Sequence, residues 1–125
     1  MVRYSDECGR LIPMEDLHST HEVVAIHTRL KAGKEADYDR IHQSIPGDLD
    51  AAMRDAGVLS WRIWRSGREL FHLIETNDYA RMRRFLAEHP ANIPWQARMA
   101  ELLEVEDDYS GEDLGIPLVW ALPPR

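Results

Sequence analysis

The sequence contains almost no cysteine, no long apolar run and little basic charge. Cys8 is the single cysteine among the 125 residues, which excludes an internal disulfide framework and any metal cluster built on several thiolates. No stretch approaches the ~20 apolar residues that a membrane-spanning helix needs, and the N-terminus has no apolar core like that of a signal peptide. We therefore expect a cytoplasmic protein that has no membrane partner.

The balance of charge also argues against nucleic-acid binding. Acidic residues outnumber basic ones by 22 to 15, which gives a formal net charge of −7. The densest basic cluster is Arg81, Arg83 and Arg84, too small for a surface that follows phosphates. Residues 101–115 contain only acidic charges, which is typical of a solvated loop after a helix. The alternative, a loop that binds a divalent cation, lacks the spacing of an EF-hand.

Several motifs of common enzyme classes are missing from the sequence. It contains no P-loop, no glycine fingerprint of a dinucleotide-binding fold and no nucleophile elbow. Nucleotide, dinucleotide and serine-hydrolase chemistries therefore have no support.

The order of the remaining patterns predicts one small domain after a tail. Residues 1–20 show no sustained period, so we expect a poorly ordered tail there and a single domain over residues 21–125. Pro46 and Gly47 should kink or restart the first helix, and Gly57 should end it. The predicted strands are residues 23–30, 58–65, 69–75 and 118–122, and the predicted helices are residues 34–56, 77–88 and 94–103.

This order predicts the ferredoxin-like α+β fold, βαββαβ, with an antiparallel sheet and its helices on one face. Both faces of the predicted strands are apolar: Trp61 and Ile63 point to one side of their strand and Trp64 to the other. Because the helices can cover one face only, the other face needs a second subunit. The sequence therefore predicts a homodimer, a dimeric α+β barrel.

His42 is the leading candidate for catalysis. It falls within the apolar stripe of the first helix, and Tyr38 lies one turn earlier on the same side. Two interpretations remain open: a core histidine that is hydrogen-bonded to a tyrosine, or an acid/base group at the mouth of a cleft.

Other histidines and the tryptophans are candidates for binding. His27 lies on one face of the first strand and His72 on the third strand, so a zinc site is an alternative, although their spacing is not diagnostic and we expect no metal. Each tryptophan is either a core residue or part of a platform for the C–H face of a sugar. Trp95 is the best platform candidate because it follows a proline-rich turn, and Trp61 and Trp64 are the others.

Residues 21–122 resemble the L-rhamnose mutarotase family and its relatives that act on L-fucose. The resemblance rests on the order and spacing of four pieces. The first is Tyr38-Asp39-Arg40-Ile41-His42, and the second is Ile45, Asp48-Leu49-Asp50-Ala51 and Gly57 before the aromatic strand Ser60-Trp61-Arg62-Ile63-Trp64. The third is Leu70-Phe71-His72-Leu73-Ile74-Glu75, and the last is Trp95 before an amphipathic helix together with a C-terminal strand.

The resemblance implies catalysis by His42 and Tyr38, and a sugar pocket that Trp95 lines. It implies an isomerase that interconverts the α and β anomers of a 6-deoxy monosaccharide, L-rhamnose or L-fucose, with no cofactor and no metal. We expect Trp61, Trp64, His72 and His27 to contribute to binding. Two alternatives remain: a cofactor-free monooxygenase on the same dimeric barrel, which would act on an apolar aromatic substrate, and a non-catalytic sugar-binding or regulatory dimer.

Overall fold

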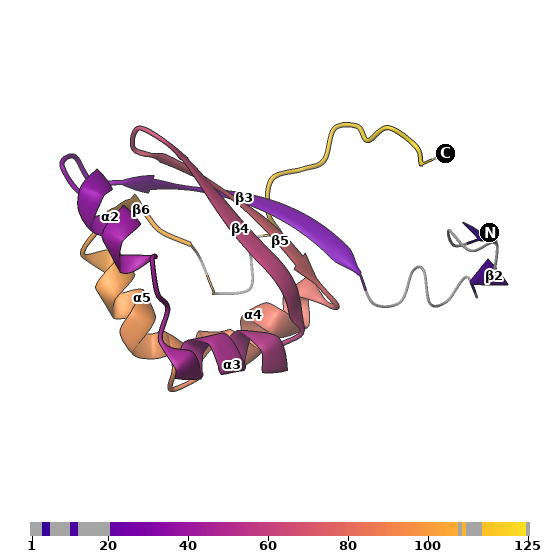
Figure 1. The fold of residues 1–125 in the computed structure, drawn as a ribbon, viewed down its shortest axis with the longest axis horizontal. Helices are drawn as coiled ribbons and strands as arrows, with labels where there is room; N and C mark the ends of the chain where they lie inside the picture. The colour runs from indigo at the N-terminus through magenta and orange to yellow at the C-terminus, as the bar shows by residue number, and fades with distance from the viewer. Residues whose placement is uncertain (1–3, 6–10, 13–20, 108, 110–113, 125) are drawn as a thin grey trace.

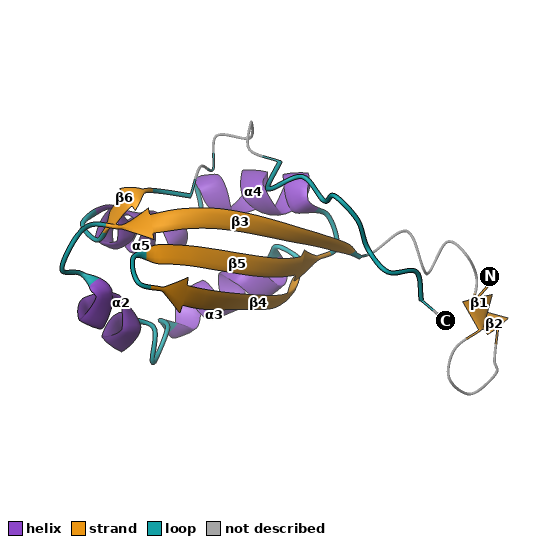
Figure 2. Cartoon of the chain, turned by 90° about the horizontal axis from the view of Figure 1, so that it is seen from above, coloured by secondary structure: helices purple, strands orange, loops and turns teal. Residues whose placement is uncertain are grey.

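A four-stranded antiparallel sheet carries the helices of the protein on one of its faces (Figure 1). The computed structural model describes residues 4–5, 11–12, 21–107, 109 and 114–124. The strand order is β4-β5-β3-β6, seen from above in Figure 2. The sheet strands are β3 (Glu22–Leu30), β4 (Val58–Ser66), β5 (Glu69–Thr76) and β6 (Leu103–Val105), and the helices are α2 (Glu35–Ile41), α3 (Gly47–Asp55), α4 (Tyr79–Ala87) and α5 (Asn92–Ala100).

Local chemistry explains where α3 begins and ends and where α4 begins. Pro46 precedes the first residue of α3, so the predicted long helix is divided into α2 and α3. Gly57 has a φ of 95°, which lets the chain turn directly from α3 into β4. Asp78 caps α4, and its side chain accepts a hydrogen bond from the backbone N–H of Arg81 at 3.1 Å.

The predicted ferredoxin-like α+β fold is confirmed, but its last strand is not where the sequence predicted it. The fourth strand is β6, in which Leu103 pairs with Leu30 and Val105 with Arg29. The structure thus ends α5 at Ala100 and uses the apolar residues after it as a sheet edge.

Residues 118–122, the predicted last strand, do not pair with any strand in the described part of the chain. They follow Gly115 and Ile116. The backbone N–H of Ile116 donates a hydrogen bond to the Ala25 carbonyl at 2.7 Å. Beyond this bond the segment is exposed, with Val119 at 96% and Trp120 at 70%. A β-branched and aromatic sequence favours a strand only when a neighbouring edge is available to pair with it.

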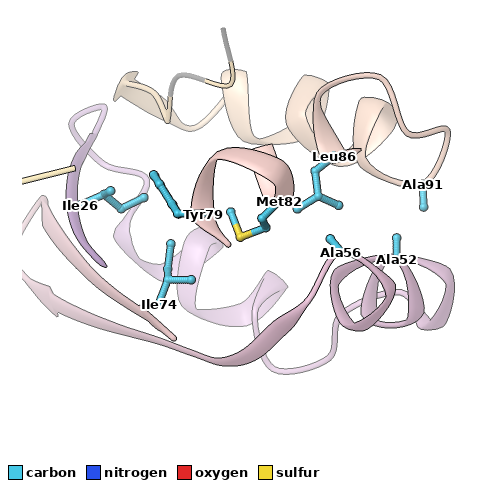
Figure 3. Packing of buried hydrophobic residues seen from close by; sticks show 8 residues of the cluster. All are labelled: Ile26, Ala52, Ala56, Ile74, Tyr79, Met82, Leu86 and Ala91. Carbon is cyan, nitrogen blue, oxygen red and sulfur yellow. The ribbon is translucent and has the colours of Figure 1, made fainter. Parts of the chain in front are cut away.

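The inner face of the sheet and the helices enclose two core clusters. The first, shown in Figure 3, joins Ile26 and Ile74 of the sheet to Met82 and Leu86 of α4 and to Ala52 of α3. The second cluster lies around Leu30, Leu70 and Tyr38 and includes Met99 and Leu102. At about 25 cal/mol per Å² of buried apolar surface, these clusters are the main source of stability.

The N-terminal residues add a two-stranded antiparallel pair, β1 (Tyr4–Ser5) and β2 (Leu11–Ile12). The rest of the predicted tail, residues 1–20, lies outside the described residues. Within the described ranges, no helix combines the length and the apolar character that crossing a bilayer requires.

Candidate active site

A cavity of about 440 Å³ lies between the inner face of the sheet and the helices. Its wall includes members of both core clusters, Leu86 and Trp61 from the first and Tyr38 and Trp95 from the second. This volume is within the range of small-molecule sites. Five of the seven predicted site residues line the cavity: Tyr38, His42, Trp61, His72 and Trp95.

His42 lies at the C-terminal end of α2, where its ring stacks against Tyr38 at 4.0 Å between centroids. Its Nδ1 is 2.9 Å from the Tyr38 carbonyl oxygen, which can only accept, so Nδ1 carries a proton. The neutral ring then has its lone pair on Nε2. His42 therefore presents a basic nitrogen on a ring that borders the cavity.

The surroundings of His42 keep the imidazole neutral at physiological pH. Burial lowers its pKa below the usual value, and the positive charge of Arg98 acts in the same direction. The hydrogen bond to the Tyr38 carbonyl and the charge of Asp39 oppose this shift without reversing it. A neutral imidazole can accept a proton and then return it, which is the requirement for acid/base catalysis.

Tyr38 is buried beneath His42 and stays protonated. Burial raises the pKa of its phenol well above the usual value, and the charge of Asp39 adds to the shift. Because the hydroxyl keeps its proton, Tyr38 can donate a hydrogen bond or act as a weak acid. Tyr38 is also part of the second core cluster, which fixes the position of α2.

Asp39 and Arg65 join α2 to β4 beside the cavity. The guanidinium donates from Nε to Oδ1 at 2.8 Å and from Nη2 to Oδ2 at 2.7 Å, a bidentate arrangement. Arg65 lowers the pKa of the Asp39 carboxyl mainly through this bonding. The pair holds the helix that carries Tyr38 and His42 against the sheet.

His72 is the centre of a buried hydrogen-bonded chain. The Trp61 indole Nε1 donates to His72 Nδ1 at 3.1 Å, so the ring proton of His72 lies on Nε2, which donates to Thr28 Oγ1 at 3.0 Å. Burial lowers the pKa of His72 to about 4, and the charges of His42 and His27 add to the effect. Because both ring nitrogens are engaged, His72 orients Trp61 and is a poor candidate for proton transfer.

Trp95, on α5, packs its ring edge-on to His42 with centroids 5.2 Å apart. One turn of the same helix also contributes Asn92 and Gln96 to the cavity wall, joined by a 3.1 Å hydrogen bond between Gln96 Nε2 and Asn92 Oδ1. Trp95, which the sequence predicted to line a pocket, thus lies in the cavity wall beside His42.

His27 and Trp64 do not reach the cavity of their own subunit. Both point to the outer face of the sheet, where His27 Nε2 lies 2.6 Å from Glu69 Oε1 and Trp64 is 54% exposed. His27 pairs in register with Phe71, whereas His72 points to the inner face. The two histidines therefore lie on opposite faces of the sheet and cannot share a zinc ion within one subunit.

The acidic segment after β6 supplies two wall residues that the sequence analysis missed. Residues 101–115 were predicted to form a solvated loop, yet Asp107 and Tyr109 line the cavity and Tyr109 packs against the first core cluster. The signal in the sequence that could have identified them is the aromatic ring of Tyr109 within a run of acidic residues. Thr28, Asn92 and Gln96 were also missed, because neutral polar residues carry no periodic signal.

Comparison with known proteins bears on this site. A family model described as L-rhamnose mutarotase matches residues 23–122. The chain belongs to the L-rhamnose mutarotase family. This confirms the resemblance and places the protein with a family of sugar isomerases, and the match includes Tyr38, His42 and Trp95.

Individual members of the L-rhamnose mutarotase family cover most of the chain. The L-rhamnose mutarotase of Rhizobium meliloti (strain 1021) is 33% identical over 99 residues, which are 78% of this chain and 92% of that protein. That of Agrobacterium fabrum (strain C58) is 32% identical over 101 residues, 79% of this chain and 94% of that protein. The crystal structure of an L-rhamnose mutarotase from Formosa agariphila shares the fold, with a TM-score of 0.65, 21% identity, and coverage of 82% and 99%.

Proposed function

We propose that the protein is a mutarotase that interconverts the α and β anomers of a 6-deoxy sugar, with L-rhamnose as the first candidate and L-fucose as the second. The observation that carries this proposal is the neutral His42 imidazole, whose Nδ1 is held by the Tyr38 carbonyl while the ring borders a cavity walled by tryptophans. L-Rhamnose is named first because it is the sugar in the names of the relatives.

The proposed reaction opens and recloses the sugar ring by proton transfer. His42 Nε2 takes the proton from the anomeric hydroxyl while an acid, either the Tyr38 hydroxyl or a water molecule, gives a proton to the ring oxygen, so that the bond between the anomeric carbon and the ring oxygen breaks. The aldehyde rotates, and the reverse transfers close the ring on its other face. Tyr38 either orients His42 or donates to the ring oxygen. Each assisted transfer contributes roughly 10²- to 10⁴-fold.

The aromatic walls suit a neutral sugar. Trp61 and Trp95 offer ring surfaces to the C–H groups of a pyranose, and the polar side chains between them can bond to its hydroxyls. The indole N–H of Trp61 is already used by His72, so this ring is held in one orientation before the sugar binds.

Saturation-transfer NMR of anomeric protons tests the proposal directly. The enzyme is mixed in turn with each sugar of a panel of 6-deoxy sugars, and exchange should accelerate most for L-rhamnose or L-fucose. Binding of sugar without faster exchange would favour the inactive sugar-binding dimer. Turnover of a quinol in air, without faster exchange, would favour the monooxygenase alternative.

Treatment with a chelator should leave the exchange rate unchanged within about twofold. Anomer exchange needs proton transfers only, and His27 and His72 lie on opposite faces of the sheet. The rate is measured before and after dialysis against EDTA, and again after zinc is added. Inactivation by the chelator that added zinc reverses would contradict the prediction that the reaction needs no metal.

We also propose a homodimer that forms on the outer face of the sheet. This face exposes Val23, Trp64 and Phe71, as the sequence pattern predicted. Light scattering should give about twice the 14.5 kDa chain mass at micromolar concentration. Trp64→Asp should shift the mass toward that of one chain, whereas Arg84→Asp, at an exposed position of α4 on the helix side of the sheet, should not. A parent protein that stays monomeric would contradict the proposal.

A further inference from the structure

A buried charged cluster lies at the part of the cavity wall that belongs to the first core cluster. Arg83 of α4 has a side chain only 2% exposed, and its Nη1 lies 3.0 Å from Tyr79 Oη and 3.5 Å from Asp107 Oδ1. The guanidinium carbon is 5.3 Å from the centre of the Tyr79 ring and 5.4 Å from that of Tyr109. Arg83 is thus held between two aromatic rings, beside the carboxylate of Asp107.

Such an arrangement is difficult to explain by stability alone. Removing a guanidinium and a carboxylate from water is costly, and apolar residues of similar volume are often as stable or more so. Unlike Arg83, Asp107 lines the cavity, and its side chain is 10% exposed. Arg83 and Tyr109 are therefore placed to hold a negative charge at the wall of the site.

Several other polar groups of the wall are hydrogen-bonded to one another. Thr28 bonds to His72, Gln96 bonds to Asn92, and the Asp39 carboxylate is bound on both oxygens by Arg65. Among the residues that the structure describes, Asp39 and Asp107 are the only carboxylates of the wall.

A carboxylate accepts up to about four hydrogen bonds. Asp107 bonds to the Tyr109 hydroxyl and lies 3.5 Å from Arg83, and because its carboxylate lines the cavity it can also accept a hydrogen bond from a donor there. Hydroxyl groups of a sugar are donors of this kind.

We propose that Asp107, held in place by Arg83 and Tyr109, accepts hydrogen bonds from hydroxyl groups of the bound sugar and selects among sugar stereoisomers. The inference rests on the proposed function, since it concerns the same cavity. Aromatic faces bind many sugars alike, whereas a fixed charged acceptor distinguishes an equatorial from an axial hydroxyl. His42 performs the proton transfer, and Asp107 determines which sugar is held in position for it.

The test compares Asp107→Asn with the parent enzyme on L-rhamnose and its 2-, 3- and 4-deoxy analogues. Dissociation constants are measured by NMR titration, and melting curves give the folded fraction. Loss of a hydrogen bond to a charged group should weaken binding of L-rhamnose about 10- to 100-fold. The analogue that lacks the contacted hydroxyl should already bind the parent weakly, and the substitution should change its affinity less than threefold. A uniform loss across all four sugars would show that Asp107 has a structural role only, and would overturn the inference.

Two further variants keep the test decisive. Tyr109→Phe keeps the aromatic ring beside Arg83 and keeps the Asp107 carboxylate, but it removes one hydrogen bond to that carboxylate. It should therefore change the ratio of the affinities for L-rhamnose and for the analogue that lacks the contacted hydroxyl. This variant tests the inference even if Asp107→Asn fails to fold. An unchanged ratio in Tyr109→Phe would count against the inference. Glu104→Gln, which alters a carboxylate outside the cavity wall, is the matched control and should change no affinity.

The failure of the inference can be told apart from the failure of the proposed function. If the parent binds no sugar and accelerates no exchange, the proposed function fails and this inference fails with it. If the parent exchanges anomers and Asp107→Asn binds every sugar as the parent does, only the inference is wrong.

Discussion

His42→Gln should slow anomer exchange roughly 100-fold or more and leave the fold nearly intact. Glutamine has similar bulk and can still donate to the Tyr38 carbonyl, but it cannot take up a proton near neutral pH. The measurement is the exchange rate per folded dimer, with melting curves alongside. A merely structural histidine would show the opposite result: loss of stability by about 1–3 kcal/mol through the lost hydrogen bond, with normal activity in the folded fraction.

The same substitution at His27 is the matched control. His27 lies on the outer face of the sheet and bonds to Glu69, so His27→Gln should keep the exchange rate within about twofold. Tyr38→Phe removes one hydroxyl beneath His42 and should slow exchange less than His42→Gln if Tyr38 only orients the imidazole. If His42→Gln exchanges L-rhamnose and L-fucose anomers as fast as the parent, the assignment of the catalytic residue is wrong.

The exchange rate of the parent should also depend on pH in a defined direction. The pKa of His42 is lowered by burial, so the basic neutral form dominates above the usual histidine value of about 6.5. The rate should therefore be flat above neutrality and fall on the acidic side, below pH 6.5. His42→Gln should remove this acidic limb.

His72→Gln should make the protein less sensitive to acid. The pKa of His72 is about 4 in the folded protein and about 6.5 in the unfolded chain. Between these two values the unfolded chain therefore binds a proton at His72 and the folded protein does not. The contribution of His72 is fully present above pH 6.5 and is lost as the pH falls toward 4. At about 1.4 kcal/mol per pKa unit, the loss is roughly 2–4 kcal/mol.

Denaturant unfolding at pH 7 and pH 4.5 measures this effect. Glutamine can accept from the Trp61 indole and donate to Thr28 without titrating, so most of the packing should be kept. Because His42 also has a lowered pKa, both proteins are compared in the His42→Gln background. If the free energy of unfolding falls by the same amount between pH 7 and pH 4.5 in the proteins with and without His72, the prediction is wrong.

The sequence predicted the part of the site that lies on periodic elements. Tyr38 and His42 share a helix face that carries the apolar stripe, and Trp61 and Ile63 share a strand face, so spacing alone showed which of these side chains lie together. The same rule put Trp64 on the opposite side of its strand, and in the structure Trp64 is exposed on the outer face. His27 was placed on one face of its strand, but a strand face does not reveal which side of the sheet the helices will cover.

The parts that the sequence did not predict depend on tertiary partners. Leu103 reads as the end of a helix until its pairing with Leu30 is known. The sequence around Asp107 indicates a solvated acid. The structure places Arg83, 24 positions earlier in the chain, beside it. Residues 118–122 have a strand sequence but no partner strand in the described part of the chain. Local propensity is overridden in each case by contacts that are distant in sequence.

The cavity borders both hydrophobic clusters, and this has a consequence for the stability of the protein. Side chains that line the open space lack dispersion partners that a filled core would provide. A sugar bound in the cavity would supply those partners and contact both clusters, so it would become part of the folded interior while it is present. The melting temperature should therefore rise with sugar concentration, as linkage between binding and folding requires. In a cell that consumes the sugar, the lifetime of the enzyme would then follow the supply of its own substrate.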